Sequence, residues 1–356
     1  MQQLIEQTLE ISPSHGIQLH LDSPKLGIQW NGAVGFTDRS HNVTREVLTP
    51  LHPMRIASTT KTFIAAAILR LWEQQQLVLD SSISEYIAAK HAHIIQKKGY
   101  ALDRITIRQL LAHTSGLFDY ADSDAFFDAV GANPQHHWTR TEQLQLAMEC
   151  GEPYGAPGEI FRYSDTGYIL LGEIIERVTG QSLGIALRQL LHYEQLGLHS
   201  TWLEIMESPP SNLLPRIHQY EGDIDVHDFD GSFDIYGGGG LISTVGDMAR
   251  FFRGLFEGKV FSSPHTLTEM LAPVPAKRGG PDYGIWKQVP GTYRLGIDAG
   301  ENDAVYSHRG HFGTLVAYVP EIDLAVGLNV SISQSGPEDL RVSLLTDILG
   351  LFDGHF

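Results

Sequence analysis

The stretch that most limits what this chain can fold into is residues 55–76, RIASTTKTFIAAAILRLWEQQQ. Its apolar residues recur with helical spacing from Phe63 onward, and Ser58 stands where an N-cap or first-turn residue belongs. The pattern therefore predicts a helix that ends near Gln76. On such a helix Ser58 and Lys61 are three residues apart and share one face. The sequence thus predicts a hydroxyl and an amine side by side at a helix N-terminus.

This pair allows nucleophilic catalysis but does not establish it. A serine hydroxyl becomes a good nucleophile when a neighbouring base takes its proton. A lysine in an apolar, positively charged pocket can lose its own proton and act as that base. The helix N-terminus adds a partial positive charge where an oxyanion would form. Taken alone, Ser-x-x-Lys is better explained by a capping serine and a solvated lysine, so the rest of the chain must supply partners.

The patterns along the chain predict an α+β fold of the α/β sandwich type. Residues 1–11 read as a helix, and residues 16–23 and 26–36 alternate as an antiparallel pair of strands. In the C-terminal part, strands are predicted at 283–289, 292–298, 304–320 and 323–331. A final helix is predicted at 337–352. The expected architecture is an antiparallel sheet built from both chain ends and flanked by helices, with a mostly helical region inserted.

We expect a single domain, residues 1–356, because no repeat or low-complexity linker divides the chain. Within it, residues 1–76 and 237–356 would form an α/β subdomain, and residues 77–236 a mostly helical inserted subdomain. The aromatic and acidic stretch 118–130, FDYADSDAFFDAV, reads either as a flap over a pocket or as a surface helix and loop.

Charge and cysteine content narrow the partners and the compartment. The chain has 25 Lys and Arg against 42 Asp and Glu, a net charge of −17, which argues against nucleic acid or an anionic membrane as the main partner. Cys150 is the single cysteine, so no intrachain disulfide is possible. The N-terminus does not read as a signal peptide, and no uncharged apolar run reaches transmembrane length, so we expect a cytoplasmic protein.

A second informative stretch, residues 157–172, reads PGEIFRYSDTGYILLG and puts Tyr163 in a polar loop just before a helix. A tyrosine is useful to acyl transfer if nearby cations lower its pKa, since the phenolate can relay a proton between nucleophile and leaving group. The alternative is a packed tyrosine, with Asp165 capping the helix that follows.

The third stretch, residues 306–314, reads YSHRGHFGT and is predicted to lie in a strand. His308, Gly310 and Gly313 form an H-x-G-x-x-G pattern. Glycine on a strand lets a substrate lie against the sheet edge and leaves an amide free to face an oxyanion. The alternative for His308 is a buried histidine that is hydrogen-bonded in the core.

Together these three stretches resemble the serine β-lactamase and penicillin-binding-protein superfamily, specifically its class C-like branch. That branch holds class C β-lactamases, DD-peptidases, D-aminopeptidases, D-amino-acid amidases and esterases. Residues 110–117, 157–180 and 238–252 look like family signature segments in the family's order. The resemblance runs from about residue 50 to residue 330 and implies the β-lactamase/transpeptidase-like fold.

The resemblance implies roles for four residues in acyl transfer. Ser58 matches the acylated nucleophile, and Lys61 its base or proton shuttle. Tyr163 matches the tyrosine of the family's Y-x-N motif. The oxyanion hole would be the backbone amides of Ser58 and His311.

Two departures from the family pattern bear on the substrate. Asp165 replaces the asparagine of Y-x-N, which donates a hydrogen bond to a substrate amide. An ionised aspartate only accepts, so Asp165 would welcome an ammonium and repel a carboxylate. His308, Arg309 and Gly310 occupy the place of K-T-G, and H-x-G is the form seen in esterase and D-aminopeptidase members. The resemblance thus implies a catalytic role for His308, and substrate contacts for Asp165, Arg309 and Gly310.

The leading function is a serine hydrolase that acts on a small ester, amide or short peptide, without cofactor or metal. A weak β-lactamase or DD-carboxypeptidase is the second interpretation, and a catalytically idle binding or sensor protein with this fold is the third. A metal-dependent enzyme rests only on the histidine pairs His91/His93 and His136/His137, which lack a third ligand at recognisable spacing. The physiological substrate and the oligomeric state are left open by the sequence.

Overall fold

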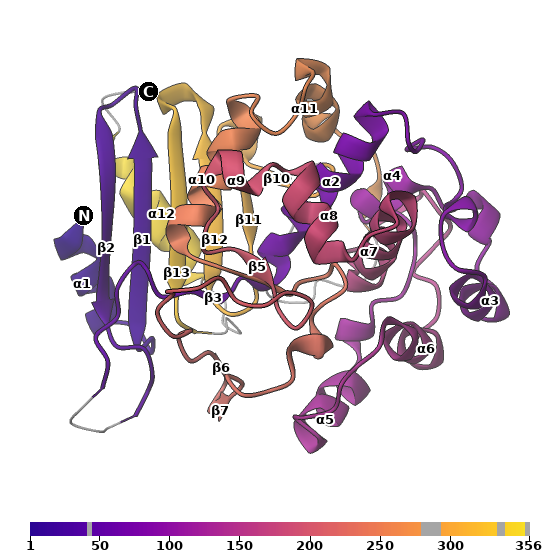
Figure 1. Cartoon of the computed structure of the whole chain (residues 1–356), viewed down its shortest axis with the longest axis horizontal. Helices are drawn as coiled ribbons and strands as arrows, with labels where there is room; N and C mark the ends of the chain where they lie inside the picture. The colour runs from indigo at the N-terminus through magenta and orange to yellow at the C-terminus, as the bar shows by residue number, and fades with distance from the viewer. Residues whose placement is uncertain (41–44, 279–292, 333–338, 353–356) are drawn as a thin grey trace.

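A six-stranded antiparallel sheet joins the two ends of the chain in the computed structural model, which describes residues 1–40, 45–278, 293–332 and 339–352. The strand order is β10-β11-β12-β13-β1-β2, so β1 lies beside the last strand, β13 (Figure 1). The strands are β1 Gly16–Ser23, β2 Ile28–Gly35, β10 Asp298–Ala299, β11 Tyr306–Arg309, β12 Thr314–Val319 and β13 Leu324–Val330. The strand expected at 283–289 lies outside the described residues.

Helices cover the sheet and build the rest of the molecule (Figure 1). They are α1 Gln2–Glu10, α2 Thr60–Glu73, α3 Ala89–Lys97, α4 Ile107–Leu111, α5 Asp124–Ala132, α6 Arg140–Cys150, α7 Asp165–Thr179, α8 Leu183–Leu190, α9 Tyr193–Leu196, α10 Val245–Phe256, α11 Pro264–Leu271 and α12 Leu340–Gly350. Short strands form three smaller sheets: β3 Met54–Arg55, β8 Leu241–Ser243 and β5 Trp202–Leu203; β4 Ile160–Phe161 and β9 Lys277–Arg278; β6 Tyr220–Glu221 and β7 Ile224–Asp225.

Both faces of the main sheet are covered, which explains why β12 and β13 are buried at every position. On one face, Ile5 of α1 and Leu344 and Ile348 of α12 pack in one cluster with strand residues such as Leu19 and Val326. On the other face, α10 contacts β1, β12 and β13. Burial on both sides fixes the register of these strands, because a shift by one residue would exchange the two faces.

Helix α2 is the buried central helix of the helical part of the molecule. All of its residues from Thr60 to Leu71 are buried, as expected for a helix that is apolar around its circumference. It packs against α7, α8 and α11. The Thr60 hydroxyl accepts a hydrogen bond from the Leu241 amide at 3.2 Å, and Thr62 donates one to the Gly296 carbonyl at 2.8 Å. These bonds fix the N-terminal turn of α2.

The predicted fold class is confirmed, and most predicted elements are present. The helix at 1–11, the strand pair at 16–36 and the final helix correspond to α1, β1–β2 and α12. The 304–320 segment is two strands, β11 and β12, joined by a turn at residues 310–313, because the chain reverses at Gly313 with φ 97°. The division into subdomains at residues 76 and 237 stays a prediction.

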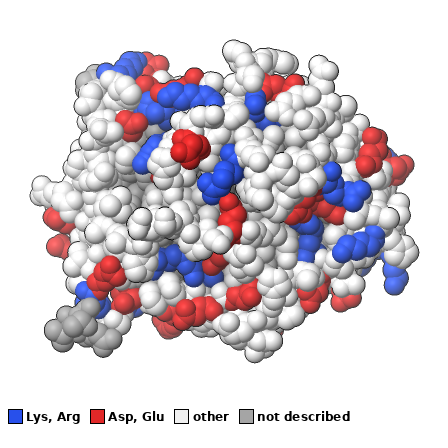
Figure 2. Space-filling model, viewed as in Figure 1, with Lys and Arg blue, Asp and Glu red and all other residues white. Residues whose placement is uncertain are grey.

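Two further observations concern the charge of the surface and the character of the helices. Over the face in Figure 2, Lys and Arg side chains are interspersed with Asp and Glu. Within the described ranges, no helix has both the length and the apolar character needed to cross a lipid bilayer.

Candidate active site

Ser58 lies in a single 3₁₀ turn, Ala57–Thr59, between β3 and α2. Ala57 has φ 45°, the left-handed region that non-glycine residues rarely occupy, so the backbone is strained immediately before Ser58. Ser58 is only 8% exposed and borders a pocket. Its hydroxyl makes no capping bond to the helix, contrary to the simpler interpretation of the sequence. It accepts a hydrogen bond from Lys61 instead.

Lys61 is completely buried, which rules out the solvated lysine considered from the sequence. Its Nζ donates to Ser58 Oγ at 2.8 Å and to the Gly238 carbonyl at 2.6 Å, and it forms an ion pair with Asp165. A buried ammonium is stable only with such partners, because removal from water costs several kcal/mol per ion. Asp165 is therefore the counterion of Lys61, and no side-chain cap was found at the N-terminus of α7.

Tyr163 lies over this pair. Its ring stacks on His113 with centroids 4.1 Å apart, and Lys61 Nζ lies 4.9 Å from its centroid. Burial, and next the charge of Asp165, raise the pKa of Tyr163 well above its usual value, although a hydrogen bond with Ser58 opposes the rise. The condition considered from the sequence, that nearby cations lower this pKa, is therefore not met, because burial and the charge of Asp165 raise it. Tyr163 is a neutral phenol beside the Ser58 hydroxyl.

His308 does not belong to the residues that line the pocket. It is 2% exposed, and its Nδ1 lies 2.9 Å from the Arg309 carbonyl oxygen. That contact makes Nδ1 the donor, so Nε2 accepts a hydrogen bond from the Tyr293 hydroxyl at 3.1 Å. Burial, and then the charge of Lys61, lower the pKa of His308 to about 3. His308 is thus a neutral, hydrogen-bonded core histidine, and its predicted direct catalytic role is not supported by this placement.

The turn after β11 carries the remaining predicted residues. A side chain at Gly310 would lie 2.1 Å from the Ile56 carbonyl oxygen, so only glycine fits against the chain that leads to Ser58. The His311 side chain borders the pocket, and its Nε2 lies 2.5 Å from Glu221. Arg309 pairs with Asp339 at 2.9 Å. Neither Arg309 nor Gly310 lines the pocket, so their predicted contacts with substrate are not supported.

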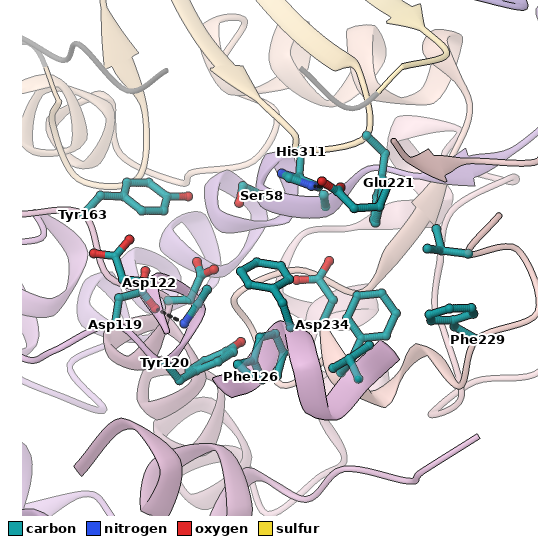
Figure 3. A pocket seen from close by; sticks show the side chains of 18 of the residues that line it. Ser58, Asp119, Tyr120, Asp122, Phe126, Tyr163, Glu221, Phe229, Asp234 and His311 are labelled. Carbon is teal, nitrogen blue, oxygen red and sulfur yellow. Dashed lines mark hydrogen bonds and ion pairs between the residues drawn. The ribbon is translucent and has the colours of Figure 1, made fainter. Parts of the chain in front are cut away.

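The backbone amides of Ser58 and His311 are the predicted oxyanion hole. Ser58 is the second residue of its 3₁₀ turn, a position whose amide has no carbonyl partner within the turn. The side chains of both residues border the same pocket, and Figure 3 shows them next to each other. The assignment stays a prediction that agrees with these positions.

The pocket has a volume of about 460 Å³ and two kinds of wall. One wall is apolar and consists of Phe126, Phe127, Val130, Phe161, Ile224, Val226, Phe229, Phe233 and Phe312. The other is acidic and contains Asp119, Asp122, Asp165, Glu221 and Asp234. Figure 3 shows Ser58, Tyr163 and His311 along one side of this space, with Asp119, Tyr120, Phe126 and Asp234 facing them. A cavity of this size suits a small molecule.

Several pocket residues were missed by sequence reasoning. Asp119, Tyr120 and Phe126 belong to the 118–130 stretch, for which a flap over a pocket and a surface helix and loop were both considered. The stretch contains helix α5, and several of its residues line the pocket. Asp234 and Glu221 come from loops and short strands without a recognisable pattern, so no signal in the sequence could have singled them out.

Three of the histidines considered as metal ligands are each hydrogen-bonded to a different carboxylate. His91 is bonded to Glu173 at 2.8 Å, His136 to Glu142 at 3.0 Å and His137 to Asp230 at 3.3 Å. Among the described residues, no group of three or more His, Cys, Asp or Glu side chains is arranged to hold a metal ion.

The sheet, the helical region and the buried Ser58–Lys61 pair together define the β-lactamase/transpeptidase-like fold. The chain belongs to the beta-lactamase family, whose model matches residues 25–348.

Similar proteins include curated relatives and solved structures. Protein flp of Staphylococcus aureus (strain MW2) is 32% identical over 182 residues, which are 50% of this chain and 34% of that protein. The chain therefore spans about a third of the length of this relative. D-amino acid amidase from Ochrobactrum anthropi SV3 has a TM-score of 0.77 at 23% identity, covering 98% of this chain and 99% of the amidase. EstCE1, a hydrolase with promiscuous acyltransferase activity, has a TM-score of 0.72 at 20% identity, covering 97% and 96%. The two structures share the fold with this chain.

Proposed function

We propose that this protein is a serine hydrolase that cleaves an ester or amide bond through a covalent acyl-enzyme on Ser58. The observation that carries the proposal is the 2.8 Å hydrogen bond between the buried Lys61 and Ser58 at the wall of the pocket. A lysine held out of water beside a single serine suits proton transfer with that serine. The names of the solved neighbours, an amidase and a hydrolase with acyltransferase activity, agree with acyl transfer.

Lys61 can act as a base only after its ammonium has released one proton to solvent. In the proposed acylation, the Ser58 oxygen then forms a bond to the substrate carbonyl carbon while the Ser58 proton passes to the Lys61 amine. The carbonyl electron pair moves to oxygen, where the amides of Ser58 and His311 stabilise the negative charge. Asp165 stabilises the ammonium that Lys61 becomes.

The tetrahedral intermediate then collapses and the bond to the leaving group breaks. The leaving nitrogen or oxygen receives a proton through the Tyr163 hydroxyl, which gives up its own proton and takes one from Lys61. Because Tyr163 is a neutral phenol, it can donate first and accept second. Water attacks the acyl-enzyme by the same route in reverse, and releases the acid and free Ser58.

The proposal is tested by covalent labelling and a substrate panel. A fluorophosphonate should add one label, on the peptide that contains Ser58, and Ser58→Ala should abolish both labelling and turnover. The panel contains p-nitrophenyl esters, D- and L-amino-acid p-nitroanilides and a chromogenic cephalosporin. A label on Ser115 or Ser164, or turnover that survives in Ser58→Ala, would overturn the assignment of the nucleophile. Turnover of the cephalosporin and of no other substrate in the panel would show that the protein is a β-lactamase and not an esterase or amidase.

A further inference from the structure

The acidic wall of the pocket contains more carboxyl groups than cationic side chains that pair with them. Two of its carboxylates have cationic partners, since Asp165 pairs with Lys61 and Asp122 with Arg162, and a third, Glu221, is hydrogen-bonded to His311. Asp119 and Asp234 form no ion pair with any described residue. Two carboxyl groups in the confined space beside Ser58 are therefore left without a direct ion pair among the described residues, although Lys61, His311 and Arg55 attract Asp234 from a greater distance.

Asp234 has a carboxyl group without an ion pair or a hydrogen bond to any described residue. Within the described part of the chain, no hydrogen-bond donor is found for its side chain, which borders the pocket and packs against the backbone of Gly239. Burial, and then the charge of Asp165, raise its pKa to about 7. Asp119 is only 3% exposed and accepts a hydrogen bond from the Ala121 amide. Its pKa is raised well above the usual range by burial, and next by Asp165.

Tyr120 gives an independent indication of a ligand at the same place. Its side chain is 1% exposed and borders the pocket, yet its hydroxyl has no hydrogen-bond partner among the described residues. Buried phenols usually find a partner. Burial, followed by the charges of Asp165 and Asp234, raises the pKa of Tyr120 well above its usual value, so the group is a neutral phenol. Figure 3 shows Tyr120 and Asp234 on the side of the pocket that faces Ser58.

A protonated amine fits these groups better than other small ligands. An ammonium has three donors and no acceptor, whereas a carboxylate and the lone pairs of a phenol provide acceptors. A charge-assisted hydrogen bond to a carboxylate is also about twice as strong as a neutral one. A carboxylate ligand, in contrast, would add a further negative charge to an acidic wall. The apolar residues that line the same pocket offer room for a hydrocarbon or aromatic side chain.

We propose that Asp234, Asp119 and Tyr120 bind the free ammonium group of the acyl portion of the substrate. The substrate class is then amino-acid amides or esters, or short peptides, with a free amino terminus and an apolar side chain. The inference rests on the proposed function of Ser58. It assigns ammonium recognition to residues other than Asp165, whose charge is balanced by Lys61.

The test uses substrates that differ in one group. Phenylalanine p-nitroanilide, in both enantiomers, is compared with 3-phenylpropionyl p-nitroanilide, which lacks only the amine. The parent enzyme should favour one phenylalanine enantiomer over the des-amino substrate. Asp234→Asn should reduce kcat/KM for the amine substrate by about 10- to 100-fold, the loss of one charge-assisted hydrogen bond, and should leave the des-amino substrate nearly unchanged. Tyr120→Phe should act in the same direction with a smaller loss.

Asp122→Asn is the matched control, because it removes a carboxylate that borders the same pocket but is already balanced by Arg162. It should leave the ratio between the two substrates nearly unchanged. Fluorophosphonate labelling of Ser58 in each variant shows that the site is folded. If Asp234→Asn does not label, Tyr120→Phe decides.

The outcomes separate this inference from the proposed function. Labelling of Ser58 with better turnover of the des-amino substrate by the parent would overturn the ammonium site and keep the hydrolase. An amine preference that persists in both variants would also overturn the assignment of these residues. Absence of labelling and of turnover in the parent would remove the proposed function itself.

Discussion

The Nζ of Lys61 lies 2.8 Å from the Oγ of Ser58, in a position where the lysine has no exposed surface. The same nitrogen is paired with Asp165, so the site contains one buried ion pair with a hydroxyl attached to it. Function and stability are therefore coupled at this point, because a change to either charged partner leaves the other without compensation.

Lys61→Ala should reduce kcat by at least about 100-fold, as expected for loss of general-base help. It should also lower the melting temperature, because Asp165 is left largely buried and unpaired. The double variant Lys61→Ala/Asp165→Asn should recover part of the lost stability and none of the activity. Steady-state kinetics and thermal unfolding of the four proteins in this cycle measure both effects. Equal melting temperatures for the single and double variants would contradict the buried ion pair.

Asp165→Asn separates two roles for Asp165. The sequence suggested that it selects amino substrates, whereas the structure pairs it with Lys61. We expect the variant to lose kcat on phenylalanine p-nitroanilide and on its des-amino analogue by similar factors, because both reactions depend on Lys61. The ratio of the two kcat/KM values is the measurement. A loss confined to the amine substrate would return ammonium recognition to Asp165.

The sequence was sufficient to predict the fold and the contact between Ser58 and Lys61, for identifiable physical reasons. The periodic apolar run after Ser58 allowed a helix and little else, and its spacing placed Lys61 beside Ser58. The alternating segments at both ends of the chain likewise predicted the strands that meet as β1 and β13. These features depend on local patterns, which a single sequence displays directly.

The chemistry of the pocket could not be predicted in the same way. Whether Asp165 faces a substrate or Lys61 depends on the approach of α7 to α2, a contact between distant segments. His308 was expected to act on the substrate. It occupies a buried position of β11, and its ring lies in the core, where it is hydrogen-bonded to Tyr293. Asp234 comes from a loop that reaches the pocket only through the tertiary fold. Long-range packing decided each of these cases.

Arg341 should position the amide of His311. Its guanidinium donates to the Gly310 carbonyl at 2.5 Å, and in a planar trans peptide the N–H of the next residue points the opposite way. Arg341→Gln should therefore lower kcat and the rate of fluorophosphonate labelling while KM changes little, because the oxyanion forms only during reaction.

Arg309→Gln is the matched control for this prediction. Arg309 and Arg341 share Asp339 as a carboxylate partner, but only the bonds of Arg341 extend to the Gly310 carbonyl in the hydrogen bonds described. The control should leave kcat close to that of the parent. Similar losses of kcat in the two variants, or a rise in KM alone in Arg341→Gln, would contradict a role in the oxyanion hole.

The last prediction concerns pH and the stability of the protein without substrate. The pKa of Asp234 is raised from 3.8 to about 7 in the folded state, mainly because the carboxyl is withdrawn from water. Between these two pH values the folded protein holds a proton that the unfolded chain has released. The contribution of Asp234 to the free energy of unfolding must therefore fall as pH rises through this window, and it is lost above about pH 7.

Asp234→Asn removes this ionisation, so the variant should be more stable than the parent at pH 8, and the difference should shrink toward pH 4. Denaturant unfolding of both proteins at several pH values measures the two curves, with Asp122→Asn as the control that keeps the parent slope. Parallel curves for the parent and Asp234→Asn would mean that Asp234 is ionised without strain, and the case for an unbalanced carboxylate awaiting an ammonium would fail.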